Sequence, residues 1–139
     1  MRCLIDTNIL ISAALFPDGI PARAFMKAVS PPHGAVVCDY SLDEMRRVYN
    51  RKFPHKIPIF ERFLSLIAVS VEIIPTPEET EESWGEEKKI RDLNDRPIYR
   101  AAVAAKVDCI LTGDKDFLDS GISHPQICTA AEFISGEVF

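Results

Sequence analysis

Long apolar runs are absent from this 139-residue sequence. Stretches such as Ile9–Phe16 and Ala101–Ala105 are far shorter than the ~20 apolar residues that a membrane-spanning helix needs. Asp6 interrupts the first apolar run, so residues 1–20 lack the basic, apolar and small-residue order of a signal peptide. We therefore expect a cytoplasmic protein that has no membrane partner.

Paired metal-binding cysteines and histidines are also missing. None of the cysteines at positions Cys3, Cys38, Cys109 and Cys128 forms a C-x-x-C pair, and no histidine stands at zinc-ligand spacing from them. Each cysteine lies in or beside a short apolar stretch. We therefore predict buried, reduced thiols, and neither a zinc site nor disulfides.

Several catalytic signatures are absent as well. The sequence has no G-x-G-x-x-G or Walker A motif, which argues against dinucleotide and nucleoside-triphosphate binding. His33, His55 and His124 stand near prolines, and no serine or cysteine is placed with them as in a catalytic triad. A phosphatase with an Asp-x-Asp nucleophile pair would need an acid where Asn8 stands. Hydrolysis through a covalent nucleophile is therefore disfavoured.

Positive charge is in deficit, since 16 Lys and Arg face 21 Asp and Glu and give a formal net charge of −5. This balance argues weakly against a sequence-independent nucleic-acid binder. Much of the excess is local, because Thr76–Lys89 holds six Glu and two Lys. We interpret this acidic segment, residues 76–89, as a solvated insertion or mobile loop with Trp84 as its candidate anchor.

The apolar stretches alternate between strand-like and helix-like patterns along one domain, which we place at residues 1–139. The strand-like stretches are continuous apolar runs, as expected for a sheet that is covered on both faces. Strands separated by helical crossovers predict a three-layer α/β/α domain with a central, mostly parallel sheet of about four to five strands. The strands are predicted at Cys3–Ile5, Ala35–Cys38, Val69–Ile74, Cys109–Leu111 and Ile127–Cys128, and the helices at Asn8–Leu15, Ile20–Val29, Ser41–Lys52, Ile59–Ile67, Pro97–Lys106 and Ala130–Ile134.

Acidic residues follow or flank three of these strands. Asp6 follows the first strand, Glu44 lies in the helix after the second, and Asp114 and Asp116 follow the fourth, while Asp95 precedes the helix that leads into that strand. Because ligands of open parallel sheets bind beyond the carboxyl ends of the strands, we expect about three of these carboxylates to converge there. Clustered carboxylates repel one another and need a positive partner, and oxygen-only ligands suit Mg²⁺ or Mn²⁺. The pattern predicts metal-dependent phosphodiester hydrolysis.

Ordinary structural roles compete for each of these acids. Asp6 could simply cap the helix that follows it, and Asp95 could be a helix-start charge favoured by the dipole. Glu44 could be only the partner of Ser41 in an S-x-x-E capping box, and Asp114 only a turn residue. We interpret the other nearby acids as solvated or capping residues, and among them Asp116 is closest to a site role: Asp39, Asp43, Asp92 and Asp116.

Four segments resemble, in order, the motifs of PIN domains. Cys3–Leu10 (CLIDTNIL) looks like the opening motif, and Leu111–Phe117 (LTGDKDF) closely resembles the fourth. Ser41–Val48 (SLDEMRRV) is similar to the second motif and Asp92–Pro97 (DLNDRP) to the third. The resemblance runs from residue 1 to about residue 134. The branch most resembled is the toxin component of toxin–antitoxin systems, related to VapC-type ribonucleases.

This resemblance implies a Mg²⁺- or Mn²⁺-dependent ribonuclease in which a metal-activated water attacks phosphorus. Members are often homodimers, and such toxins are inhibited by a small antitoxin protein that covers the site. The resemblance assigns the catalytic and metal-binding acids to Asp6, Glu44, Asp95 and Asp114, an accessory metal ligand to Asp116, and polar supports to Thr7, Asn8 and Thr112.

Basic residues near the acids are candidate contacts for RNA phosphates. A band made of Arg46, Arg47, Arg51, Lys52, His55 and Lys56 runs from the Glu44 helix into the next loop. Arg96 and Arg100 lie one helical turn apart beside Asp95. We predict RNA contacts at Arg96, Arg100 and Arg46. The alternative is an ordinary solvated helix face.

The third PIN-like motif carries few acids, because Asn94 and Arg96 stand where relatives often have more of them. This departure supports an alternative function, a non-catalytic PIN-like module that binds RNA or protein. A metal-dependent nuclease that acts on structured DNA is a third hypothesis.

Overall fold

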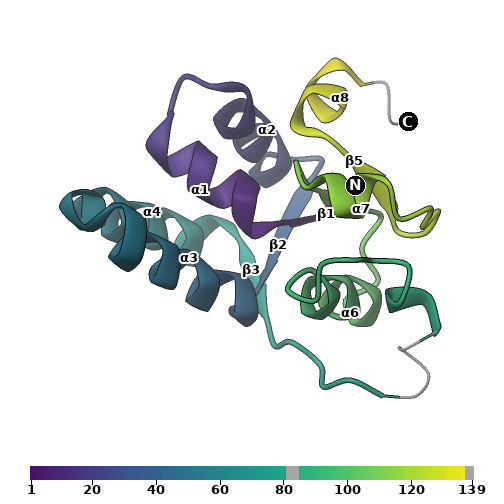
Figure 1. The fold of residues 1–139 in the computed structure, drawn as a ribbon. Helices are drawn as coiled ribbons and strands as arrows, with labels where there is room; N and C mark the ends of the chain where they lie inside the picture. Colours follow the sequence, from purple (N-terminus) through teal and green to yellow (C-terminus); the bar gives the residue numbers. More distant parts are fainter. Residues whose placement is uncertain (81–84, 137–139) are drawn as a thin grey trace.

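A five-stranded sheet forms the centre of the computed structural model, which describes residues 1–80 and 85–136 (Figure 1). The spatial order is β3-β2-β1-β4-β5, and every neighbouring pair is parallel. All carboxyl ends therefore lie at one edge of the sheet, which we call the carboxyl edge. The strands are β1 (Arg2–Ile5), β2 (Gly34–Cys38), β3 (Glu72–Ile74), β4 (Cys109–Leu111) and β5 (Gln126–Cys128).

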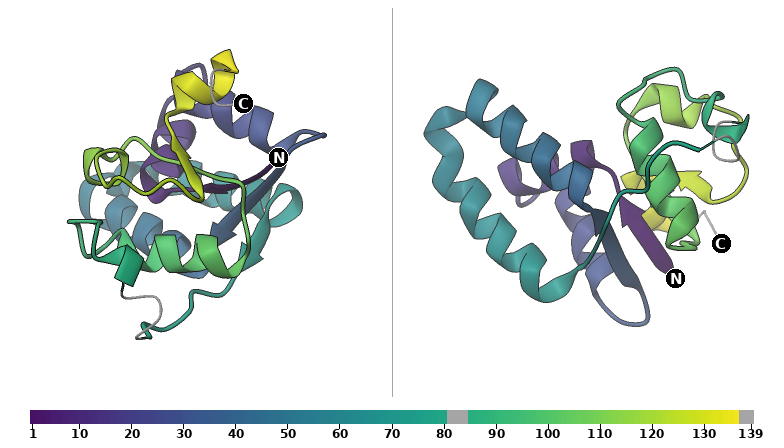
Figure 2. Two further views of the ribbon diagram at one scale, coloured as in Figure 1. Left: turned by 90° about the vertical axis from the view of Figure 1, so that its right-hand side faces the viewer. Right: turned by 90° about the horizontal axis from the view of Figure 1, so that it is seen from below.

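Helices cover both faces of this sheet, so the predicted three-layer α/β/α fold is confirmed (Figure 2). One face packs against α1 (Thr7–Leu15), α2 (Ile20–Val29), α3 (Asp39–Lys52), α4 (Ile57–Ser70) and α8 (Ala130–Ser135), and the other against α6 (Arg96–Ala104) and α7 (Lys115–Leu118). The short 3₁₀ turn η1 (Pro54–Lys56) joins α3 to α4. No single described helix is long and apolar enough to cross a membrane, and α1 with α2 passes that test only as a pair bent by 111°.

Alternate strand residues face the two helical layers. In β1, Cys3 and Ile5 pack with the larger layer, whereas Leu4 packs with the α6 layer. Val37 and Val36 of β2 divide in the same way. All five side chains are fully buried, which explains why the strands read as continuous apolar runs. Each such side chain contributes about 1.5–3 kcal/mol through removal from water.

The helix predicted from Ser41 begins two residues earlier, and its predicted cap is not formed. Helix α3 begins at Asp39, and Ser41 is buried in its first turn with its hydroxyl 3.4 Å from the Cys38 sulfur. Ser41 therefore does not act as an N-cap for Glu44. A capping box does start α8, where the side chains and backbone amides of Thr129 and Glu132 bond reciprocally.

Three other boundaries differ from the sequence-based expectation. Helix α4 continues to Ser70, so the strand predicted from Val69 begins only at Glu72. Helix α6 ends at Ala104, and Lys106 beyond it has a left-handed φ of 54°. The predicted loop 112–116 contains the start of α7.

The four cysteines are free and buried, as predicted. Cys3 and Cys109 face each other on β1 and β4, with their sulfur atoms 3.1 Å apart.

Solvation of the whole acidic segment is a wrong prediction. Glu87 is fully buried, and one of its carboxylate oxygens lies 3.0 Å from Nη1 of Arg100 on α6. The same guanidinium donates through Nε to the Pro77 carbonyl at 3.1 Å. A buried carboxylate is tolerated because this cation is placed against it. The predicted anchor Trp84 lies outside the described residues.

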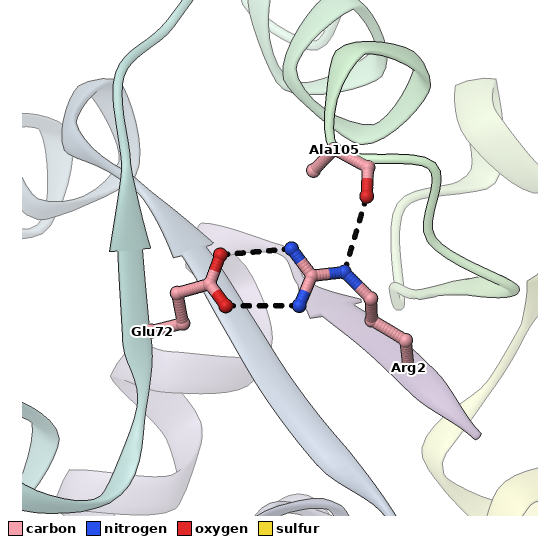
Figure 3. Close-up of polar contacts among 3 residues, drawn as sticks. All are labelled: Arg2, Glu72 and Ala105. Carbon is pink, nitrogen blue, oxygen red and sulfur yellow. Dashed lines mark hydrogen bonds and ion pairs between the residues drawn. The ribbon is translucent and has the colours of Figure 1, made fainter.

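At the opposite, amino edge of the sheet, Arg2 joins three elements (Figure 3). Its guanidinium makes two parallel hydrogen bonds to the Glu72 carboxylate of β3, at 2.9 and 2.8 Å. Its Nε donates to the Ala105 carbonyl just after α6, at 3.1 Å. These contacts join β1, β3 and the end of α6 at the edge of the sheet opposite the carboxyl edge.

Candidate active site

Asp6 is the first acid at the carboxyl edge, directly after β1. Its side chain is 1% exposed and caps α1 by accepting a hydrogen bond from the Thr7 amide at 2.7 Å. The other carboxylate oxygen accepts from the Thr112 hydroxyl, also at 2.7 Å. Its backbone amide donates to the Leu111 carbonyl of β4 at 2.9 Å. The capping alternative is therefore realised, and it also fixes the carboxylate beside the end of β4.

Asp114 is positioned by the same threonine. Its backbone amide donates to the Thr112 hydroxyl at 3.0 Å, and its side chain caps α7 by accepting from the Asp116 amide at 2.8 Å. Thr112 is fully buried at the end of β4. One hydroxyl thus links the first and fourth sequence motifs, which are separated by about a hundred residues in the chain.

Asp95 lies where α6 begins and is 5% exposed. It does not cap the helix with its side chain, and its buried Oδ2 has no hydrogen-bond partner among the described residues. One ligand oxygen each from Asp92, Asp95 and Asp114 lies within 4.8 Å of the others. We call these three residues the carboxylate cluster.

The electrostatics of Asp6 reflect its burial. Burial raises its pKa to about 7, although the hydrogen bonds from Thr112 and Thr7 act in the opposite direction. The charges of Glu44 and Asp114 raise the pKa further. Glu44 of α3 is therefore near enough for its charge to act on the Asp6 carboxyl group.

Asp95 is perturbed more strongly. Burial raises its pKa to about 9, and the charge of Asp6, the hydrogen bond and charge of Asp114, and the charge of Asp92 act in the same direction. Burial and the neighbouring carboxyl groups therefore disfavour the ionised forms of Asp6 and Asp95 unless a positive charge lies beside them.

The donor set fits a hard divalent cation. The carboxylate cluster supplies oxygen ligands from Asp92, Asp95 and Asp114, and the unpartnered Oδ2 of Asp95 is an acceptor that the described residues leave unused. Oxygen ligands of this kind suit Mg²⁺ or Mn²⁺ better than zinc.

The remaining acids that the sequence singled out occupy different places. Glu44 is partly exposed on α3 and lies outside the carboxylate cluster, although its charge acts on Asp6. Asp116 is outside the cluster too, and its carboxylate lies 3.8 Å from Nε of the exposed Arg91. Asp92, which we interpreted as a solvated or capping residue, lies inside the cluster. Its position three residues before Asp95 was the available signal.

Two of the predicted polar supports make less contact with the acids than Thr112 does. Thr7 bonds Asp6 through its backbone amide, while its buried hydroxyl has no partner among the described residues. Asn8 is exposed on the first turn of α1.

The predicted RNA-binding arginines are engaged in internal contacts. Arg96 donates through Nε to the Ile90 carbonyl at 3.0 Å, and Arg100 is paired with the buried Glu87. The Arg46 guanidinium lies over the Phe60 ring, 5.3 Å from its centre. Sequence reasoning did not single out Arg91, which is exposed beside Asp116.

Comparison with known families places the chain. Residues 2–116 match the family model of the PIN domain. Because this match covers most of the 139 residues, the protein belongs to the PIN domain family. A comparison with curated proteins finds no match.

Two solved structures share the fold. One is a chain from the crystal structure of VapBC2 from Rickettsia felis bound to a DNA fragment from their promoter, with 15% identity, a TM-score of 0.68 and coverage of 93% of this chain and 98% of that chain. The other is VapC20 of Mycobacterium tuberculosis, described as a sarcin–ricin loop cleaving toxin, with 16% identity, a TM-score of 0.62 and coverage of 86% and 95%. At 15% and 16% identity, the two comparisons show that the fold is shared and nothing beyond it.

Proposed function

We propose that this PIN-domain protein is a Mg²⁺- or Mn²⁺-dependent endoribonuclease and the toxin of a toxin–antitoxin pair. The observation that carries the proposal is the convergence of Asp92, Asp95 and Asp114 beside the buried Asp6 at the carboxyl edge. Support for the toxin role comes from family membership and from the two toxin–antitoxin structures that share the fold.

Each residue has a role in this proposal. Asp95 and Asp114 would hold the cation together with Asp92, while Asp6 adds negative charge from the end of β1. Thr112 orients two of the acids by donating to Asp6 and accepting from the Asp114 amide. When bound, the cation would lower the pKa of a water molecule and offset charge on the phosphodiester.

The test is cleavage of single-stranded RNA by the purified chain with Mg²⁺ or Mn²⁺. We expect Asp114→Asn to lower the rate at least ~100-fold, which corresponds to about 2.7 kcal/mol of transition-state stabilisation. Asp119→Asn is the matched control, because it is the same substitution at an exposed acid after α7, outside the carboxylate cluster. EDTA should abolish cleavage by the wild-type chain.

Other outcomes would replace this function. Calorimetric binding of Mn²⁺ without any RNA cleavage would favour the non-catalytic binding module. Cleavage of structured DNA in preference to RNA would favour a DNA nuclease. Equal RNA cleavage by the wild-type and Asp114→Asn chains would refute the assignment of the site.

An antitoxin partner is the second part of the proposal. An apolar groove of about 290 Å³ lies between α1, α2 and α4, and exposed apolar side chains such as Met26 and Leu66 line it. We propose that a small antitoxin protein covers this groove. The test begins with a search for a short reading frame next to this gene. Co-purification of its product, lost in Met26→Asp and kept in an exposed control such as Asn50→Asp, would support this partner. A stable homodimer of the pure chain that Met26→Asp dissociates would assign the groove to a second copy instead.

A further inference from the structure

Tyr40 is a partly exposed aromatic residue at the start of α3 that the proposed mechanism does not use. It lies one helical turn before Glu44 and two before Arg47, so the three share one face of the helix. The charges of Glu44, Asp92 and Asp95 all act on its phenol. Tyr40 therefore lies beside the acidic site.

The phenol also connects α3 with the segment that carries two of the clustered acids. Its hydroxyl donates to the side-chain oxygen of the exposed Asn94 at 3.2 Å. The backbone N–H of Asn94 donates to the Asp92 carboxylate at 2.9 Å. Tyr40, itself part of α3, thus links this helix to Asn94 through its hydroxyl, while part of its side chain packs against the core on the α6 side.

The two neighbouring arginines of α3 point to different rings. The Arg47 guanidinium lies over the Tyr40 ring, 5.9 Å from its centre, whereas that of Arg46 lies over Phe60, on the α4 side. Both arginines are exposed. Bases of single-stranded RNA stack on aromatic rings, and its phosphates bind basic groups such as a guanidinium. Tyr40 and Arg47 place one group of each kind beside the acidic site.

We propose that Tyr40 and Arg47 hold one nucleotide of single-stranded RNA next to the scissile bond, with the base stacked on the Tyr40 ring and a phosphate at the Arg47 guanidinium. This inference rests on the proposed ribonuclease function. It assigns RNA contact to Arg47 in place of Arg46, which the sequence had favoured. Base stacking tolerates every base, so this nucleotide position contributes affinity without strict sequence preference.

The first experiment separates the ring from its hydroxyl. A short fluorescein-labelled single-stranded RNA of mixed sequence is titrated in Mg²⁺ with the Asp114→Asn chain, so that bound RNA is not cleaved. In this background, Tyr40→Leu should weaken RNA affinity by about 5- to 150-fold, the range observed for loss of a stacked aromatic. Tyr40→Phe keeps the ring and should leave affinity nearly unchanged. In the active chain, Tyr40→Leu should raise KM more than it lowers kcat, and Tyr40→Phe should change neither.

The second experiment locates the stacked base. A series of RNAs is prepared in which one nucleotide at a time lacks its base. At one position the affinity loss from the missing base and the loss from Tyr40→Leu should not add, because both remove the same contact. Full additivity at every position would overturn the stacking role.

The third experiment uses the adjacent arginines as a matched pair. Arg47→Ala should reduce the slope of log affinity against log salt by about 0.7, the value for one phosphate on a single strand, and Arg46→Ala should not. Equal effects of the two substitutions would overturn the placement of the phosphate.

The outcomes also separate this inference from the function on which it rests. If the wild-type chain binds and cleaves RNA but Tyr40→Leu binds as tightly as Tyr40→Phe, only the nucleotide-holding role fails. If the wild-type chain neither binds nor cleaves RNA, the function and the inference fail together. Thermal unfolding of each variant shows whether a loss of binding is only a loss of fold.

Discussion

Replacing the ionisable carboxyl group of Asp95 with an amide should stabilise the metal-free protein at neutral pH. Asp95 is almost completely buried, and burial together with the neighbouring acids raises its pKa from 3.8 to about 9. Asparagine has nearly the same shape but does not titrate. Asp95→Asn therefore removes a group whose ionised form the fold disfavours, while keeping a side chain that can bond Asp114.

The sign and the size of the effect follow from proton linkage. The unfolded chain releases the Asp95 proton above pH 3.8, while the folded chain keeps it to about pH 9, so unfolding of the wild-type protein becomes easier as pH rises through this window. From 3.8 to pH 7 is 3.2 pH units, and 1.36 kcal/mol per unit sets an upper limit of about 4 kcal/mol. The stability advantage of Asp95→Asn should therefore grow by about 2–4 kcal/mol between pH 4 and pH 7.

Urea unfolding in EDTA at both pH values measures this difference. With a typical urea dependence of about 2 kcal/mol per molar, the gap between the two midpoints should widen by about 1–2 M. The exposed control Asp119→Asn should show no such change. A gap between wild type and Asp95→Asn that is the same at pH 4 and pH 7 would refute the claim that this carboxyl is desolvated in a cluster.

The cation should remove most of the stability difference between the two proteins. Mg²⁺ at about 100 times its dissociation constant stabilises a protein that binds it only in the folded state by about 2.7 kcal/mol. We expect this gain in wild type and a much smaller gain in Asp95→Asn. An equal gain in both proteins would show that the ion binds without Asp95.

Three further predictions follow from the same contacts. Thr112→Val should lower the steady-state rate of RNA cleavage at least ~10-fold, about 1.4 kcal/mol, because it removes the hydroxyl between Asp6 and α7. Thr112→Ser keeps a hydroxyl and should retain most of the activity. Glu87→Ala should lower the free energy of unfolding by about 3 kcal/mol in urea titrations, since it leaves Arg100 unpaired in a largely buried site, and a loss below 1 kcal/mol would contradict a structural role for that pair. At limiting Mg²⁺, the rate of RNA cleavage should rise with pH between about 6 and 9 as Asp6 and Asp95 lose protons. Saturating Mg²⁺ should move this rise to lower pH, because the ion competes with protons for the carboxylates. A pH profile that does not respond to Mg²⁺ would contradict this prediction.

Local patterns in the sequence were sufficient for the architecture. Apolar runs such as Cys3–Ile5 and Cys109–Leu111 are strands because their residues alternate between two buried layers, and the helical stretches between them require a parallel sheet. A parallel sheet in turn brings the residues after each strand to one edge, which is why Asp6 and Asp114 could be expected there.

The exact membership of the site depended on contacts between distant segments. Asp92 and Glu44 are both acids near a helix start, yet only Asp92 has a carboxylate oxygen within 4.8 Å of those of Asp95 and Asp114. The sequence predicts an RNA contact at Arg100 beside Asp95 and carries no sign that this guanidinium pairs with the buried Glu87 of the acidic segment. No periodic pattern of residues in the sequence indicates either contact.

The sequence by itself determined the helices and strands, the parallel arrangement of the strands and the edge of the sheet that carries the acids, because hydrophobic periodicity and helix signals act over a few residues. Only the tertiary structure decided which acids share a cation site, which arginine is buried in an ion pair, and that Arg47 and not Arg46 lies over Tyr40. The physical reason is that side-chain direction and desolvation depend on packing between segments that are far apart in the chain.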